Sequence, residues 1–339
     1  MKKSSLVVLL ALSFALPGRA QEVNPLFASK NSIHLKASGS IKAIKKNTND
    51  STYSSGKFLY EKESGQWIEL ETEARVRGNF RLKNCYFPPL KLKFKKKEVL
   101  NTPFEGNKSV KLVLPCEKQS TMNRLVAREY VCYQFYEVIT PYHFKTRLVN
   151  LELTEMSGRK PRVFDLLGFL VEDNSKVADR SQGKIIEMKG LNPAAFDARQ
   201  TVRNDYFQYM IGNADWSAVY QHNSNILFAE GKYMPLPYDF DMAGIVNASY
   251  AQSNPPSLGT GDVRQRVYRG FCKEESVMQE IRQEYLQREQ DFYKLIDQQS
   301  ALLKDTDTQD MHNYVEEFYE ILKSDQLFKR SILEGCRTN

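Results

Sequence analysis

Short stretches in which apolar and polar side chains alternate dominate residues 56–115. The clearest stretch is residues 90–94, in which Leu90, Leu92 and Phe94 point to one side and Lys91 and Lys93 to the other. Alternation with a period of two predicts half-buried β-strands. Further strands are expected at residues 57–60, 67–70, 74–77, 147–153 and 166–173. The first half of the chain is therefore predicted to be rich in β-structure, whereas residues 21–55 are polar and are expected to form loop and edge strands.

Apolar residues with the spacing of an α-helix occur in one segment of the first half of the chain and in most of the second half. Residues 120–138 are expected to form a helix, with these residues on one apolar stripe: Leu125, Glu129, Cys132 and Tyr136. Glu129 on such a stripe needs a cationic partner or must reach solvent. Further helices are expected at residues 196–211, 277–296 and 311–322, and a hairpin at residues 225–237. The order predicts an α+β protein with a junction near residues 172–182.

The N-terminus is typical of a secretory signal. Lys2 and Lys3 precede an apolar run over residues 6–16, which is too short to span a bilayer, and small residues flank Arg19 before Gln21. The alternative is a buried N-terminal helix. Removing residues 1–20 takes away these three cations and lowers the net charge from +7 to +4, which is too mild to indicate a nucleic-acid partner. No later run is apolar enough for a transmembrane helix, so the protein is expected to be periplasmic, envelope-associated or extracellular.

Export permits disulfides among the five cysteines. Cys85 and Cys116 flank a strand-like segment and lie in turn-like contexts, so this pair is favoured. Cys272 and Cys336 are a second candidate pair, and Cys132, on the predicted helix, is expected to be a buried thiol. The cysteines lack zinc-type spacing and the four histidines are scattered, which argues against a histidine-based metal site.

Asn and Asp residues gather in three neighbouring segments, residues 212–217, 222–225 and 237–241. The predicted elements place them at a helix end, in a loop and after a hairpin. Phosphoryl transfer uses such a set, because one carboxylate orients or deprotonates the acceptor hydroxyl while Asn and Asp oxygens hold Mg²⁺. The alternative is turn chemistry, since Asn and Asp hydrogen-bond their own backbone in loops.

Five motifs resemble, as an ordered set, the spore-coat kinase (CotH) family, and in particular a secreted branch common in Bacteroidota. They occupy residues 75–79, 88–94, 169–173, 209–216 and 237–244. The resemblance covers about residues 70–275 and implies a divergent, two-lobed protein-kinase-like fold. It would comprise a signal peptide (1–20), a polar segment (21–55), a β-rich N-lobe with one central helix (56–175) and a mainly helical C-lobe (176–339).

The resemblance also implies roles for the Asn and Asp residues. Asp215 would contact the acceptor hydroxyl as the catalytic-loop aspartate. Asn223 would be the metal-binding asparagine, with Asn225 as the competing choice. Asp239 would hold Mg²⁺ or Mn²⁺ together with ATP, and Asp241 would be a second ligand.

The same resemblance implies that Lys91 or Lys93 neutralises the nucleotide phosphates and that Glu129 positions that lysine. The alternative is that both lysines face water. Glu172, beside Asp173, falls where a kinase places its adenine-contacting hinge. Two further cations that could reach a phosphate are Arg75 and Arg77.

The expected function is thus a secreted kinase that transfers phosphate to an exported protein or other acceptor. The alternative is an inactive relative that serves as a binding module of the cell envelope. Intact Asp215, Asn223 and Asp239 favour the kinase, while the lack of a G-x-G-x-x-G loop and the distance from cytosolic ATP favour the module. A third reading is a hydrolase in which Asp239 and Asp241 hold a metal that activates water.

Overall fold

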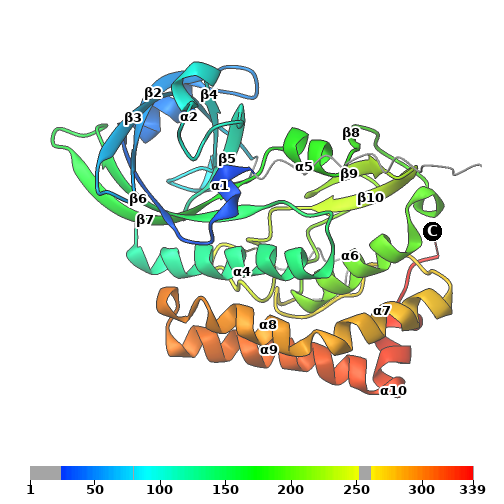
Figure 1. Ribbon diagram of the computed structural model, residues 1–339. Coiled ribbons are helices and arrows are strands. Elements are labelled where there is room, and N and C mark those ends of the chain that lie inside the picture. The colour runs from blue at the N-terminus through cyan, green and yellow to red at the C-terminus, as the bar shows by residue number, and fades with distance from the viewer. Residues whose placement is uncertain (1–23, 79, 252–260, 339) are drawn as a thin grey trace, which may run out of the picture.

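A closed barrel of seven strands forms the first half of the protein (Figure 1). The computed structural model describes residues 24–78, 80–251 and 261–338, so the predicted signal peptide lies outside the described residues. Around the barrel the strands run in the order β1-β2-β3-β4-β5-β7-β6. Their bounds are Ile33–Gly39 (β1), Ser54–Glu61 (β2), Trp67–Val76 (β3), Leu90–Phe94 (β4), Ser109–Val113 (β5), Thr146–Glu155 (β6) and Arg162–Val171 (β7).

The expectation of an α+β protein is confirmed, but the expectation of a two-lobed, kinase-like fold is wrong. The barrel closes because β1 pairs with β2 on one side and, in parallel, with β6 on the other, where Ile33 lies opposite Val149. Alternate residues of each strand fill the interior with apolar side chains such as Leu35, Tyr60 and Leu112. β1 lies in the segment that was expected to hold only loop and edge strands, and it has no free edge left.

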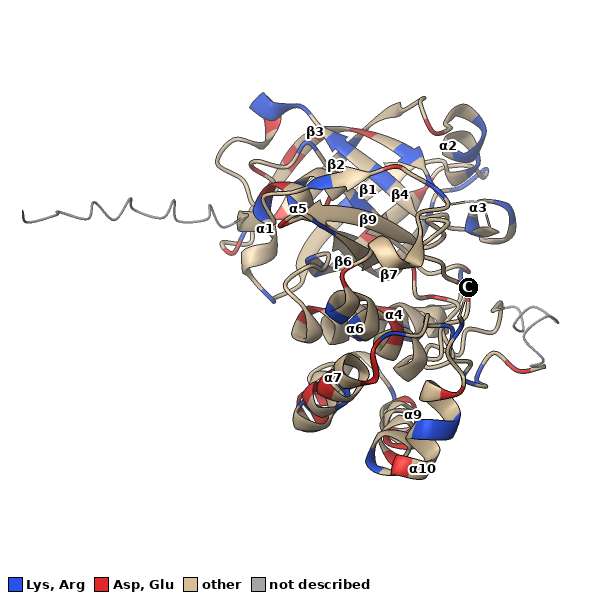
Figure 2. Cartoon of the chain, turned by 90° about the vertical axis from the view of Figure 1, so that its right-hand side faces the viewer, with Lys and Arg blue, Asp and Glu red and all other residues tan. Residues whose placement is uncertain are grey.

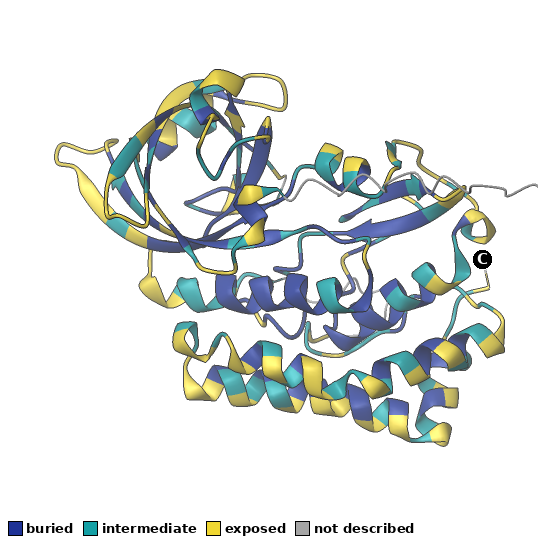
Figure 3. Cartoon of the chain, in the orientation of Figure 1, coloured by how far each residue is buried: buried dark blue, intermediate teal, exposed yellow. Residues whose placement is uncertain are grey.

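Helix α4 (Asn123–Ile139) lies between the barrel and a layer of C-terminal helices (Figures 1 and 3). That layer contains α7 (Glu275–Gln287), α8 (Glu289–Asp297) and α9 (Asp305–Lys323), and α6 (Ala198–Met210) packs beside it. α4 is therefore buried on nearly all sides, and not along one stripe as expected. The single helix expected at residues 277–296 is divided at Arg288 into α7 and α8.

A second, three-stranded sheet carries the Asn and Asp cluster. Its order is β10-β9-β8, and the predicted hairpin turns at Glu230 and Gly231, which both adopt positive φ. The strands are β8 (Lys184–Ile186), β9 (Ser224–Ala229) and β10 (Lys232–Pro237). The short helices are α1 (Pro25–Ala28), α2 (Ile41–Asn47), α3 (Phe80–Asn84), α5 (Asn174–Arg180) and α10 (Asp325–Phe328).

Both expected disulfides are present, and Cys132 is a buried free thiol, as predicted. Cys85–Cys116 joins the end of α3 to the chain after β5, and Cys272–Cys336 joins the segment before α7 to the C-terminal residues. Two disulfides fit an exported protein. Among the described residues, none of the helices is long and apolar enough to cross a membrane.

Candidate functional site

Asp215 and Asn223 form one side of the site, in the loop between α6 and β9. The amide nitrogen of Asn223 donates to the main-chain oxygen of Asp215 at 2.8 Å and to its Oδ2 at 3.0 Å. Nε2 of His222 lies 2.7 Å from Oδ1 of the same carboxylate. Asn223 has a φ of 48°, a left-handed conformation that Asn tolerates better than most residues. Because its nitrogen is committed to Asp215, the amide of Asn223 has a fixed orientation, and its oxygen remains available as a ligand.

Asp239 begins the segment after β10 and is held by α4. Its backbone N–H donates to the hydroxyl of Tyr133 at 2.9 Å, and its φ of 65° is again left-handed. The next residue, Phe240, packs its ring 4.7 Å from that of Tyr133. The backbone N–H of Tyr238 donates to the main-chain oxygen of Asn223 at 3.0 Å. The segments that carry Asn223 and Asp239 are therefore directly joined, as the sequence predicted for a hairpin-delivered carboxylate.

Behind Asp239 lie two buried carboxyls that share one guanidinium. Arg81 of α3 has Nη1 3.9 Å from Oε2 of Glu129 and Nε 3.7 Å from Oδ2 of Asp241. All three side chains are almost completely buried. Arg81 is also anchored by a hydrogen bond from Nη2 to the main-chain oxygen of Leu114. The expected cationic partner of Glu129 is thus an arginine from α3.

Burial controls the protonation of Asp241, Glu129 and Arg81. It raises the pKa of Asp241 to about 7, and the charge of Asp239 adds to that effect while Arg81 opposes it. Burial likewise raises the pKa of Glu129 well above its usual value. Burial alone would lower the pKa of Arg81, but Tyr250, Asp241 and Glu129 outweigh it, so the guanidinium stays charged. The structure thus places Asp241, which the sequence suggested as a second metal ligand, in a buried pair with Arg81.

Lys111 of β5 is a cation that the sequence analysis did not single out. It is 8% exposed, and its Nζ donates to Oδ1 of Asn174 at 2.8 Å and lies 4.4 Å from the ring centroid of Phe144. Burial lowers its pKa to about 7, and the charges of Arg77 and Lys91 lower it further, whereas Asp173 and Asp239 oppose them. Arg77 makes no ion pair with any described residue.

The two lysines expected to bind nucleotide phosphates, Lys91 and Lys93, lie in different surroundings. Lys91 lies opposite Lys111 in the β4–β5 register, and its Nζ is 3.3 Å from Oδ2 of Asp173. Lys93 is exposed and pairs with Glu73 on the barrel wall. Neither lysine forms an ion pair with Glu129 in the described part of the chain.

Glu172 and Asn225 have local partners. Glu172 is buried, lies 3.2 Å from Nε of Arg180, and accepts the backbone N–H of Lys145 at 3.1 Å. Its carboxylate therefore joins β7 to neighbouring chain segments. Asn225 lies inside β9, opposite Leu236 of β10, and Asn223 is the residue that contacts Asp215.

Asp239 and Asn223 are the residues of this site whose oxygens could hold a metal ion. Within the described ranges, no three His, Cys, Asp or Glu side chains are grouped closely enough to hold a metal ion by themselves. Mg²⁺ usually keeps several waters and takes one or two carboxylates, with substrate phosphates completing its shell. The Asp239 carboxylate and the Asn223 amide oxygen are the two groups of the site with this chemistry.

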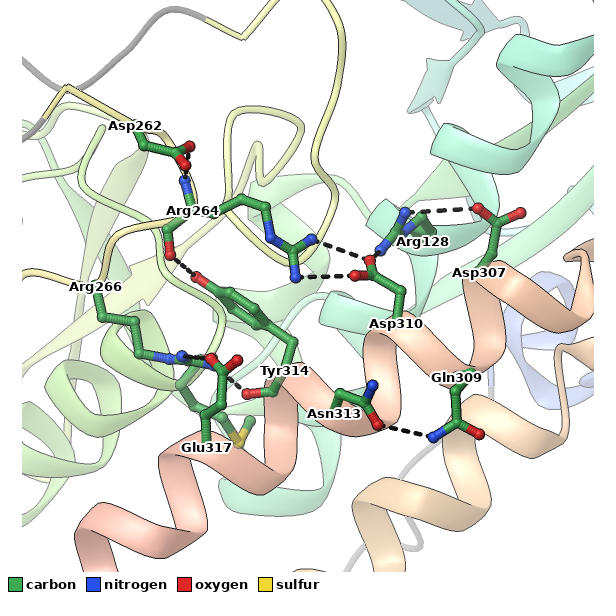
Figure 4. A network of polar contacts seen from close by, with 11 residues as sticks. Arg128, Asp262, Arg264, Arg266, Asp307, Gln309, Asp310, Asn313, Tyr314 and Glu317 are labelled. Carbon is green, nitrogen blue, oxygen red and sulfur yellow. Dashed lines mark hydrogen bonds and ion pairs between the residues drawn. The ribbon is translucent and has the colours of Figure 1, made fainter.

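A polar network supports the site from the helical layer (Figure 4). Asp310 of α9 accepts from Arg128 of α4 and, at 3.0 Å, from Arg264. The hydroxyl of Tyr314 donates to the main-chain oxygen of Arg264 at 2.9 Å and lies against Gly212, just before the Asn213–Asp215 turn. A side chain at Gly212 would overlap this hydroxyl. The network therefore fixes the loop after residue 261 and the end of α6 to the same helix.

The chain matches no protein-family model, and no curated protein has a significant sequence match to it. Inferences about activity therefore depend on the residues described above.

Proposed function

We propose that this protein is a Mg²⁺-dependent phosphotransferase that moves a phosphoryl group from a nucleotide such as ATP to a hydroxyl of an exported protein or other acceptor. The observation that supports it most is the grouping of Lys111, Arg77 and Lys91 within the electrostatic reach of one another near Asp239. Lys111 is buried, and the nearby charges of Arg77 and Lys91 add to the lowering of its pKa. A buried lysine perturbed in this way favours a bound anion, and such perturbation is typical of functional sites. A polyphosphate with its metal ion has the matching charge.

Each residue has a defined task in this proposal. Asn223 and Asp239 would hold the ion, which neutralises charge on the transferred phosphoryl group. Lys111 and Arg77 would bind the phosphate oxygens. The acceptor oxygen forms the new bond to phosphorus as the bond to the nucleoside diphosphate breaks, and the hydroxyl proton passes to Asp215. The carboxylate of Asp215 has about four lone-pair sites, so the contacts with His222 and Asn223 leave it able to accept that proton.

The first test is nucleotide binding by the purified protein, followed through its melting temperature. ATP with Mg²⁺ is expected to raise it, and ATP or Mg²⁺ alone to raise it less. A ligand present at about 100 times its Kd adds about 2.7 kcal/mol to the free energy of unfolding. Asp239→Asn is expected to remove the Mg²⁺-dependent shift and to keep the fold. Asp165→Asn is the matched control, because Asp165 is an exposed aspartate on the barrel wall.

Three outcomes separate the candidate functions. A Mg²⁺-dependent shift lost in Asp239→Asn supports the proposal and justifies acceptor screening by transfer of labelled phosphate. Phosphate release at the same rate with and without acceptor would indicate a hydrolase. If ATP and Mg²⁺ leave the melting temperature unchanged, the proposal is wrong and the binding-module reading takes its place.

A further inference from the structure

One end of the barrel carries a group of cations that lack acidic partners. They come from four segments of the chain, namely α2, α3, the residues after Cys116 and the β6–β7 hairpin. The group, called here the basic end, consists of Lys42, Lys45, Lys46, Lys83, Lys118, Arg159, Lys160 and Arg162. Within these segments only Glu117 and Glu155 are acidic, and Glu155 is buried.

Specific contacts hold the four segments together. Oε2 of Glu155 accepts the backbone N–H of Ile41, which fixes the start of α2 to the base of the hairpin. Nζ of Lys45 donates to the main-chain oxygen of Cys85 at 2.8 Å, which fixes α2 to the end of α3. Nζ of Lys118 lies 3.9 Å from the ring centroid of Tyr86. Figure 2 shows the cations of α2 and α3 on the same side of the barrel.

Several lysines elsewhere on the barrel wall have carboxylate partners. Lys36 pairs with Glu152, Lys57 with Glu69 and Lys95 with Glu71. Within the described residues, no member of the basic end forms an ion pair. The positive charge of the basic end is therefore not balanced by neighbouring carboxylates, and a polyanionic partner would balance it.

The tip of the β6–β7 hairpin adds exposed apolar side chains to this charge. Met156 is 50% exposed and Val163 is 61% exposed, and they flank Arg159, Lys160 and Arg162. Basic side chains together with exposed apolar ones are the combination by which peripheral proteins bind anionic bilayers, since the cations attract the headgroups while the apolar groups enter the interface. The phosphate backbone of a nucleic acid offers no apolar region for Met156 and Val163 to enter, whereas a bilayer interface offers both the negative charge and the apolar region.

We propose that the basic end docks this protein onto the surface of an anionic lipid bilayer, with the tip of the β6–β7 hairpin entering the headgroup region. The contact is peripheral and does not depend on the phosphotransferase function. Each Lys or Arg near such a surface contributes about 1 kcal/mol, so removing three of them corresponds to a loss of affinity of about a hundredfold.

Vesicle co-sedimentation tests the proposal. The purified protein is expected to sediment with vesicles of equal parts phosphatidylcholine and phosphatidylglycerol, to stay in solution with phosphatidylcholine alone, and to be released by salt. The triple variant Arg159→Gln, Lys160→Gln, Arg162→Gln is expected to lose about a hundredfold in affinity. The matched control Lys36→Gln, Lys57→Gln, Lys95→Gln removes the same number of charges from paired positions and is expected to bind nearly as well as the original protein.

The apolar part of the contact has its own variants. Met156→Ser with Val163→Ser is expected to weaken vesicle binding about tenfold, whereas Leu100→Ser, at another exposed apolar position, leaves it unchanged. Equal losses in the test and control triple variants would overturn the proposal, as would equal binding to neutral and anionic vesicles. Binding to DNA or polyglutamate without binding to anionic vesicles would assign the basic end to a different partner and would also overturn it.

Discussion

Lys111 illustrates why a single buried charge can escape sequence analysis. All five residues of β5 are buried, so the strand lacks the alternation that drew attention to Lys91 and Lys93 on β4. A lysine in a short apolar run gives no sign of which groups will face it. Asp215 and Asn223 were easier to identify as site candidates. Both lie between a predicted helix end and a predicted hairpin, and this position in the sequence limited where they could lie in the fold.

We expect Lys111→Met to weaken Mg²⁺-nucleotide binding at least tenfold with little loss of stability. Replacing a buried charge by an apolar side chain of similar size is often neutral or stabilising. Lys93→Met is the control, because this exposed lysine pairs with Glu73, and it should leave binding unchanged. Melting temperatures measured with and without ATP and Mg²⁺ check both variants. Equal effects of the two substitutions would contradict the role given to Lys111.

At the scale of elements, the Cys85–Cys116 disulfide brackets the contact that holds Arg81. The main-chain oxygen of Arg81 accepts the backbone N–H of Cys85 at 2.9 Å. The guanidinium of Arg81 donates to the main-chain oxygen of Leu114, two residues before Cys116. The Cys85–Cys116 pair could be predicted from turn contexts and an exported setting, and Cys272–Cys336 was a second candidate pair. The support that the Cys85–Cys116 disulfide gives to the buried carboxyls of Glu129 and Asp241 could not be predicted. It depends on how α3 folds back over the end of the barrel.

Removing each disulfide should separate stability from binding. The pairs close loops with sequence separations of 31 and 64 residues, so chain entropy predicts losses of about 3–5 kcal/mol for either one. Cys85→Ser with Cys116→Ser is expected also to weaken nucleotide binding, because Arg81 loses its anchor. Cys272→Ser with Cys336→Ser is expected to lower the melting temperature to a similar degree but to keep the Mg²⁺-dependent shift. A shift that survives in both double variants would show that α3 does not support the site.

At the scale of the whole molecule, strands β6 and β7 lie between two apolar cores and contribute side chains to both. One fills the barrel, and the other surrounds α4 and the C-terminal helices. Local patterns predicted most strands and helices of both halves, since alternation and helical period are local. The closed barrel was missed because the parallel pairing of β1 with β6 joins segments far apart in sequence, and the polar residues around β1 hid its two inward side chains, Ile33 and Leu35.

The stability of the whole protein should depend on pH in a defined direction. Burial raises the pKa of both Asp205 and Asp241 to about 7, from an ordinary value of 3.8. The folded state then binds protons that the unfolded state has released, so the contribution of these two carboxyls to the free energy of unfolding falls as pH rises from about 4 to about 7. His143 acts in the opposite direction, because burial lowers its pKa to about 4. Asp205→Asn is expected to make this fall shallower, as measured by urea unfolding across that range. An unchanged slope would mean that Asp205 is ionised in the folded protein.

The pairing of Ile33 with Val149 also has a consequence for biosynthesis. Ribosomes deliver β1 before β2 to β5 and long before β6, so β1 leaves the tunnel with one hydrogen-bonding edge that nothing can yet occupy. Contacts between distant segments form slowly, and exposed strand edges invite pairing with other chains. The interval between the synthesis of β1 and of β6 is therefore the period in which a nascent chain of this protein most needs a chaperone.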